Sequence, residues 1–161
     1  MMLIGIISDS HDNMPKIESA VQVFEDRGVG HILHAGDFIA PFTAAPFVEL
    51  GCRMTGVFGN NDGEKRLLRE KFAPVGEIHD VAARLELAGR SICVVHEPYV
   101  LDALVASGAF DLIGYGHTHK LDVRAGRTVV LNSGEAGGWV TKRCTVATVD
   151  LTSMAVDVMD L

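Results

Sequence analysis

The chain has 161 residues, of which 48% are hydrophobic and 22% are charged, an ordinary composition for a globular protein with one sizeable core. Its 21 acidic residues exceed its 14 basic residues and give a net charge of -7, which disfavours broad contact with the phosphate backbone of DNA or RNA. No apolar run approaches the roughly 20 residues of a membrane-spanning helix, and the cysteines at 52, 93 and 144 stand far apart among apolar neighbours, which predicts buried thiols.

The first apolar run, residues 2–7, lacks polar alternation, as is typical of a strand buried on both faces of a parallel sheet. The sequence turns polar directly afterwards, at Asp9-Ser10-His11. In open α/β sheets, ligands bind beyond the carboxyl ends of the strands, so a carboxylate and an imidazole two residues apart indicate a metal site.

A helix cap is the alternative interpretation of this polar stretch. Asp12 or Asn13 could cap the helix that opens at Pro15 without any part for Asp9 or His11. Apolar residues at helical spacing predict the helix itself: Ile17, Ala20, Val21 and Phe24.

The same succession of strand, polar turn and helix follows twice more. Residues 31–34 form a predicted strand that runs into Gly36-Asp37, and a short helix is expected near 43–50. A third strand, 53–58, ends in Gly59-Asn60-Asn61-Asp62, and a helix over 64–72 follows. We interpret Asp62 as a turn residue and N-cap of that helix.

Antiparallel strands enter in the second half. Residues 84–87 and 91–95 flank Gly89-Arg90, which predicts a tight hairpin whose second strand leads to His96. Pro98 opens a helix whose apolar face is expected to carry Val100, Leu101, Leu104 and Val105.

A further strand, 111–115, ends in Gly116-His117-Thr118-His119, where an extended backbone would point both imidazoles to the same side. Short strands at 122–125 and 128–131 follow, and a hairpin of 143–150 with 154–159 completes the chain. The strand ends together offer oxygen and imidazole donors without sulfur: Asp9, His11, Asp37, Asn60, His96, His117 and His119.

Such a donor set suits Mn, Fe or Zn. A two-metal site holds its ions ~3.5–4 Å apart, and Asp37 is the natural bridging carboxylate. A lone histidine at a strand end is more often structural, but ligand-type residues at five strand ends favour a dimetal site. We interpret His31 and His79 as structural, and His34 either orients a ligand or packs within its strand.

These motifs resemble the signature of the calcineurin-like metallophosphoesterases along the whole chain, and the short length resembles the bacterial and archaeal YfcE- and MJ0936-type phosphodiesterases. The resemblance implies an α/β fold, a two-sheet α/β sandwich flanked by helices without a cap domain. It also implies one metal held by Asp9, His11, Asp37 and His119, and another held by Asp37, Asn60, His96 and His117. The catalytic positions it implies are Asp37, Asn60, Asn61 and His96.

Two residues depart from the family pattern. Many members have a histidine that assists the leaving group where this chain has Asn61, which cannot donate a proton in that way. A glycine usually follows the histidine at position 96, and Glu97 here adds a carboxylate near the pocket.

We therefore expect a single domain, residues 1–161, that acts as a dimetal phosphoesterase, above all a phosphodiesterase, through in-line attack of a metal-bound hydroxide. Manganese is the first choice of ion, with Ni, Fe, Zn or Mg as alternatives. The expected substrate is a small phosphate ester and not polymeric nucleic acid. Because the N-terminus lacks a signal-peptide pattern, we expect a cytoplasmic protein without membrane contact, and a homo-oligomer is compatible with the sequence.

The rival hypothesis is a binding module, because a related retromer subunit has this fold yet serves mainly as an assembly scaffold. A scaffold has no physical need of a complete ligand set, and every ligand position is filled here. A metal-storage or regulatory protein, which would take up metal without turnover, is a third alternative.

Overall fold

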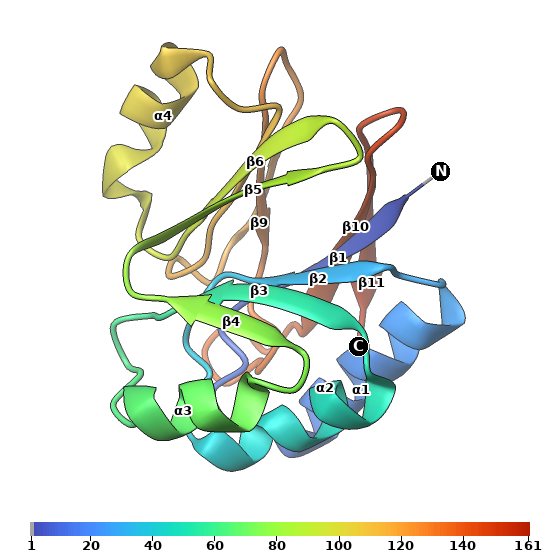
Figure 1. The fold of residues 1–161 in the computed structure, drawn as a ribbon, viewed down its shortest axis with the longest axis vertical. Helices are drawn as coiled ribbons and strands as arrows, with labels where there is room; N and C mark the ends of the chain where they lie inside the picture. Colours follow the sequence, from blue (N-terminus) through green and yellow to red (C-terminus); the bar gives the residue numbers. More distant parts are fainter. Residues whose placement is uncertain (1) are drawn as a thin grey trace.

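The computed structural model describes residues 2–161, and Figure 1 shows its fold. Strands and helices alternate in the first half of the chain, and strands predominate in the second half. In chain order the elements are β1 (Leu3–Ile7), α1 (Met14–Asp26), β2 (His31–His34), the 3-10 helix η1 (Pro41–Thr43), α2 (Ala44–Leu50), β3 (Arg53–Val57), α3 (Lys65–Phe72), β4 (Gly76–His79), β5 (Ala82–Leu87), β6 (Arg90–Val95), the 3-10 helix η2 (Pro98–Val100), α4 (Leu101–Ser107), β7 (Leu112–Gly114), β8 (Leu121–Arg124), β9 (Val129–Ser133), β10 (Thr145–Asp150) and β11 (Ala155–Asp160).

Two mixed sheets form the centre of the fold. The first has six strands in the order β11-β10-β1-β2-β3-β4, and the second has five in the order β5-β6-β7-β9-β8. Strands β1 to β4 are parallel to one another, as are β6, β7 and β9. The remaining pairings are antiparallel. Each sheet therefore gathers the carboxyl ends of its parallel strands at one edge, where α/β proteins place their ligands.

Apolar side chains fill the layers between sheets and helices. Ile4 and Ile6 of β1 pack with Leu112 of β7 in the core between the two sheets. Ile7 instead joins Phe24 in the core under the helices. Figure 1 shows α1, α2 and α3 together on one face of the first sheet, with α4 against the second sheet. This arrangement confirms the predicted two-sheet α/β sandwich, and it explains why β1, buried on both faces, is apolar throughout.

One strand was not predicted, and two local predictions need correction. The sequence did not indicate β4, an edge strand in which only Ile78 is fully buried. The hairpin turn lies at Ala88-Gly89, where φ is +50° and +76°, so it starts one residue earlier than predicted. The helix after Pro98 begins as η2, and of its predicted apolar face only Leu101 is buried.

The cysteines partly follow expectation. All three thiols are free, and Cys93 is buried, but Cys52 and Cys144 are only half-buried. Cys52 lies just before β3, where its thiol donates a hydrogen bond to the backbone oxygen of Val29.

Among residues 2–161, no helix is both long and apolar enough to cross a membrane.

Candidate metal centre

Polar side chains from both sheets meet at the carboxyl ends of five parallel strands. The strand ends and their polar residues are β1 with Asp9 and His11, β2 with Asp37, β3 with Asn60, β6 with His96, and β7 with His117 and His119. The structure thus brings together all seven side chains that the sequence offers as ligands. They form two groups that share Asp37.

The first group consists of Asp9, His11, Asp37 and His119, whose candidate ligand atoms all lie within 4.8 Å of one another. Nε2 of His11 lies 3.2 Å from Nε2 of His119 and 3.5 Å from Oδ2 of Asp37. Nε2 of His119 lies 3.4 Å from Oδ1 of Asp9. Carboxylate oxygens and imidazole nitrogens that converge in this way form a donor set that Mn, Fe or Zn accepts.

The second group surrounds Oδ1 of Asn60. Nε2 of His96 and Nδ1 of His117 each lie 2.9 Å from this oxygen. Nε2 of His96 also lies 3.6 Å from Oδ2 of Asp37. Asp37 therefore contacts both groups, which is the position that a bridging carboxylate requires.

The electrostatics of the centre favour a bound cation. Burial raises the pKa of Asp9 from 3.8 to about 7, and the Asp37 carboxylate adds to the rise, although a hydrogen bond from Ser8 opposes it. Burial lowers the pKa of His11 despite the opposing charge of Asp37. A divalent cation would favour both the ionised carboxylate and the neutral imidazole, so these residues fit a metal.

The backbone of the candidate ligand residues is left-handed at five positions. The φ angles are +53° at Asp9, +42° at His11, +59° at Asp37, +69° at His117 and +59° at His119. Non-glycine residues seldom adopt this region, and each instance costs of the order of 1–3 kcal/mol. Such strain gathers at functional sites, where the surrounding structure holds it in place.

This backbone corrects the prediction for Gly116-His117-Thr118-His119. The segment is not extended, because φ is positive at both histidines. Their imidazoles consequently turn to different groups, His117 to Asn60 and His119 to His11. One short segment thereby serves both halves of the centre.

Two glycines leave room for the buried carboxylates. A Cβ atom at Gly59 would lie 2.0 Å from Oδ1 of Asp37. A Cβ atom at Gly116 would lie 2.0 Å from Oγ of Ser8 and 2.9 Å from Oδ2 of Asp9. Any side chain at either position would therefore displace a carboxylate or its hydrogen-bond partner.

Asp62 has a different role from the predicted helix cap. The N-cap of α3 is Glu64, whereas Asp62 is buried and accepts hydrogen bonds from three backbone amides. Its Oδ2 accepts from Asp37 and Gly59 at 3.0 and 2.7 Å, and its Oδ1 accepts from Ile39 at 2.7 Å. Asp62 therefore ties the loop after β2 to the loop after β3, because a buried carboxylate must satisfy its oxygens locally.

The cap alternative for Asp12 and Asn13 is also wrong. Asn13 occupies the N-cap position of α1, but its side chain makes no capping hydrogen bond. It donates instead to the backbone oxygen of Gly137 at 2.7 Å. Oδ1 of Asp12 accepts from the backbone of Ala40 at 2.8 Å. Both side chains fasten neighbouring loops around the centre.

His34 packs beside the centre, where its Nε2 lies 3.4 Å from Oγ of Ser10. Its fully buried ring stacks on Phe38 at 3.6 Å between centroids, and its Nδ1 accepts a hydrogen bond from the backbone of Gly36. Burial lowers its pKa well below the usual value, which keeps the ring neutral. It therefore supports the turn that carries Asp37. His31 and His79 contact neighbouring strand residues outside the centre.

Glu135 contacts the centre through His119, although it belongs to none of the motifs predicted from the sequence. Its Oε1 lies 3.2 Å from Nδ1 of His119, an ion-pair contact that is not aligned as a hydrogen bond. The carboxylate accepts hydrogen bonds from the backbone of Val140 and from the backbone and hydroxyl of Thr141. Burial raises the pKa of Glu135, but these hydrogen bonds outweigh it and lower the pKa. The sequence feature that could have indicated Glu135 is its position just after β9, a further parallel strand.

Asn61 faces the carboxylate of Asp37. Its Nδ2 donates to Oδ2 of Asp37 at 2.8 Å, and its backbone N–H donates to Oδ1 at 3.0 Å. Both oxygens of Asp37 thus receive a hydrogen bond from the same residue. The Asn61 amide orients Asp37 and carries no titratable proton.

Comparisons with known proteins show which family the chain resembles. A sequence model described as a calcineurin-like phosphoesterase superfamily domain matches residues 2–154. Phosphodiesterase MJ0936 of Methanocaldococcus jannaschii is 34% identical over 154 residues, which cover 92% of this chain and 93% of that protein. The solved structure of a novel archaeal phosphodiesterase has a TM-score of 0.94 and 31% identity, covering 99% of this chain and 100% of that one.

A more distant likeness concerns the fold alone. Vps29 of Chaetomium thermophilum superimposes with a TM-score of 0.71 at 16% identity, covering 100% of this chain and 96% of that one. At this identity, shared function does not follow from shared architecture.

Proposed function

Because the chain belongs to the calcineurin-like phosphoesterase superfamily, we propose that it is a metal-dependent phosphodiesterase that hydrolyses small phosphate esters. The observation that carries the proposal is the contact of Asp37 with two groups of ligand-type side chains. The similarity to an archaeal phosphodiesterase over nearly the whole length of both chains supports the same reaction class.

Two divalent ions would share Asp37 between them. One ion would be held by Asp9, His11, Asp37 and His119, and the other by Asp37, Asn60, His96 and His117. Manganese is our preferred ion, since the donors are oxygen and imidazole nitrogen without thiolate. When bound, such ions supply positive charge to the phosphoryl oxygens and lower the pKa of the attacking water.

The chain's own residues set the geometry of this reaction. Asn61 holds the Asp37 carboxylate through two hydrogen bonds, and Asp62 holds the Asp37 backbone. His96 is fixed at its second nitrogen, where Nδ1 lies 2.7 Å from the backbone oxygen of Ala35. That contact directs Nε2 into the centre and sets the tautomer of the ring. These contacts orient the donors before substrate arrives.

The scaffold alternative has no specific support in the site. The likeness to Vps29 concerns the fold alone, and the complete, converging ligand set has no use in a scaffold. The cytoplasmic location, the single domain over residues 1–161 and a homo-oligomeric state stay predictions.

The experiment that tests the proposal is hydrolysis of bis-p-nitrophenyl phosphate and p-nitrophenyl phosphate by the purified chain after chelation. Mn, Ni, Zn or Mg is then added back separately, and metal content is measured alongside turnover. We expect turnover to disappear with chelation, to return with metal, and to favour the diester. Stoichiometric metal binding without hydrolysis of either ester would instead support the storage or scaffold alternatives.

A further inference from the structure

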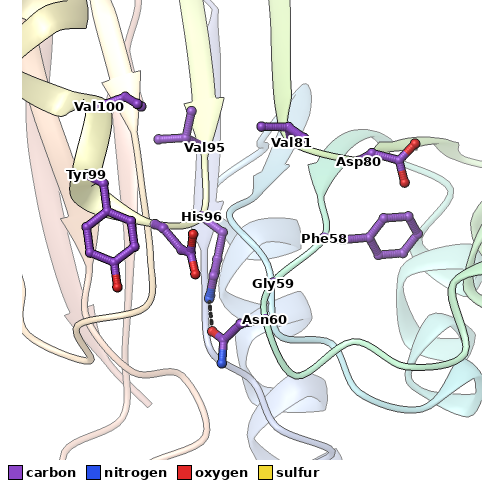
Figure 2. A pocket seen from close by; sticks show the side chains of 10 residues that line it. Phe58, Gly59, Asn60, Asp80, Val81, Val95, His96, Tyr99 and Val100 are labelled. Atoms are coloured by element: carbon purple, nitrogen blue, oxygen red, sulfur yellow. Dashed lines mark hydrogen bonds between the residues drawn. The ribbon is translucent and has the colours of Figure 1, made fainter.

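A cavity of about 240 Å³ opens beside the second ligand group, and Asn60 and His96 are part of its wall. Figure 2 shows Tyr99 on one side and Phe58 on the other, with Asn60 and His96 between them. Pockets that enclose a whole ligand usually measure roughly 300–1,000 Å³. This smaller cavity therefore fits one substituent of a substrate whose phosphate lies at the metal ligands.

The walls of the cavity are largely apolar and aromatic. Tyr99 and Val81 are 78% and 77% exposed, so both side chains are open to a ligand in the cavity. The Tyr99 ring lies 6.2 Å from the His117 ring between centroids, so the aromatic wall reaches the ligand residues. Rings in such a position provide contact area for a planar or apolar group at little entropic cost.

The charges on the cavity wall are negative. None of its ten lining residues is Lys or Arg, and two of them, Asp80 and Glu97, are acidic. Asp80 is paired with Arg69 at 2.9 Å. Glu97 has no ion-pair partner in the part of the chain that the structure describes. Lys65 lies 5.0 Å from the centroid of the Phe58 ring, but it does not line the cavity.

We propose that this cavity is the subsite for one ester substituent, that it accepts an uncharged aromatic or apolar group, and that Glu97 excludes an anionic one. The proposal rests on the phosphodiesterase function above and specifies its substrate class: diesters with at least one uncharged aryl or apolar substituent. Tyr99 supplies contact with that substituent, and Glu97 supplies selectivity. A substrate whose substituent in the cavity carries a second phosphate or a carboxylate is excluded, because the Glu97 carboxylate repels that negative charge.

Binding of non-hydrolysable phosphonates to the metal-reconstituted chain tests this subsite without reliance on turnover. Isothermal titration compares methylphosphonate, phenylphosphonate, 4-carbamoylphenylphosphonate and 4-carboxyphenylphosphonate, of which the last two differ in charge at nearly equal size. We expect phenylphosphonate to bind at least about tenfold more tightly than methylphosphonate. The carboxylate should bind about tenfold more weakly than the carbamoyl compound.

Matched variants assign these effects to residues. Tyr99→Ala should remove most of the advantage of the phenyl group, whereas Tyr99→Phe should keep it. Glu97→Gln should bring the carboxylate and carbamoyl compounds to equal affinity. Glu18→Gln, the same charge change at an exposed position on α1, should leave their ratio as it is in the unaltered chain.

Equal binding of methyl- and phenylphosphonate, or an unchanged charge preference in Glu97→Gln, would overturn the inference. Turnover of bis-p-nitrophenyl phosphate is measured on the same preparations. If bis-p-nitrophenyl phosphate is hydrolysed and the phosphonates all bind with equal affinity, only the subsite assignment fails. If the ratios are as expected and hydrolysis is absent with every metal, the proposed function fails instead.

Discussion

The carboxylate of Glu135 lies 3.2 Å from Nδ1 of His119, while Nε2 of the same ring lies 3.4 Å from Asp9. The imidazole is thus held between a carboxylate outside the ligand set and a carboxylate within it. A metal-binding histidine commonly has such a partner at its second nitrogen, which fixes the ring and raises its basicity. We therefore propose that Glu135 positions His119.

Glu135→Gln should weaken metal binding by about 10- to 100-fold, because the partner of His119 loses its charge. Thr141→Val is the matched control, since it removes one hydrogen bond to Glu135 and leaves the His119 contact in place. Competition with a chromophoric chelator measures both affinities. If both variants bound metal as tightly as the unaltered chain, Glu135 would have no part in positioning His119.

Asp37→Asn should lose both metal ions and reduce turnover at least about 100-fold, because it removes the carboxylate shared by the two groups. The metal-free variant should unfold at a temperature no lower than that of the metal-free unaltered chain, since a buried charge beside Asp9 is gone. Thermal unfolding in chelator checks this second expectation. Unaltered turnover by the purified variant would contradict the dimetal proposal.

His119→Ala and His96→Ala should each remove one ion, because the two side chains belong to different groups around Asp37. The double variant should bind neither ion. His79→Ala serves as a control outside the centre, where the ring contacts Glu77. Metal analysis after gel filtration gives the stoichiometries, and two tightly bound ions in either single variant would show that its histidine is not a ligand.

Gly116→Ala should displace the Asp9 carboxylate, because its Cβ would lie 2.9 Å from Oδ2 of Asp9 and 2.7 Å from the backbone oxygen of Ala35. Gly114→Ala is the control two residues earlier, at the end of β7, where the nearest atom, from Val94, lies 3.9 Å away. We expect Gly116→Ala to bind metal more weakly and Gly114→Ala to bind it normally. If Gly116→Ala bound metal as tightly as the unaltered chain, the strand end would have to shift without disturbing Asp9.

Asn61 leads to a prediction about the leaving group. A positioned general acid contributes roughly 10²–10⁴-fold, and the Asn61 amide offers none, so kcat/KM should depend steeply on the pKa of the leaving alcohol. Asn61→His should reduce this slope and narrow the gap between nitrophenyl and alkyl esters. Asn61 is exposed, so the larger ring has space. A flat dependence in the unaltered chain would show that another group already supplies the proton.

The order of the elements and the strand-end residues could be read from the sequence, because buried parallel strands are apolar runs and the residues after them change abruptly in polarity. The predicted strand 31–34 coincides with β2, and the first strand differs from β1 by one residue. By contrast, β4 has a single buried side chain, Ile78, which gives no periodicity to detect.

The details of the centre could not be predicted in the same way. Left-handed φ angles at His117 and His119 are uncommon for any residue other than glycine, so the pattern of the sequence does not predict them. Asp62 has the composition of a turn, and only the positions of Asp37 and Gly59 reveal it as a buried acceptor. Glu135 follows a predicted strand but belongs to no motif, and its contact with His119 becomes evident only in the folded chain.

Each ligand group draws on both sheets. Asp37 follows β2 in the first sheet and lies within reach of His96, which follows β6 in the second, and the pairing of His11 with His119 repeats this arrangement. Bound ions would therefore cross-link the two sheets at this edge. The free energy of metal binding would then add to the free energy of unfolding. The metal-free chain would be the form most susceptible to proteolysis. Metal scarcity would therefore lower the amount of the protein as well as its activity.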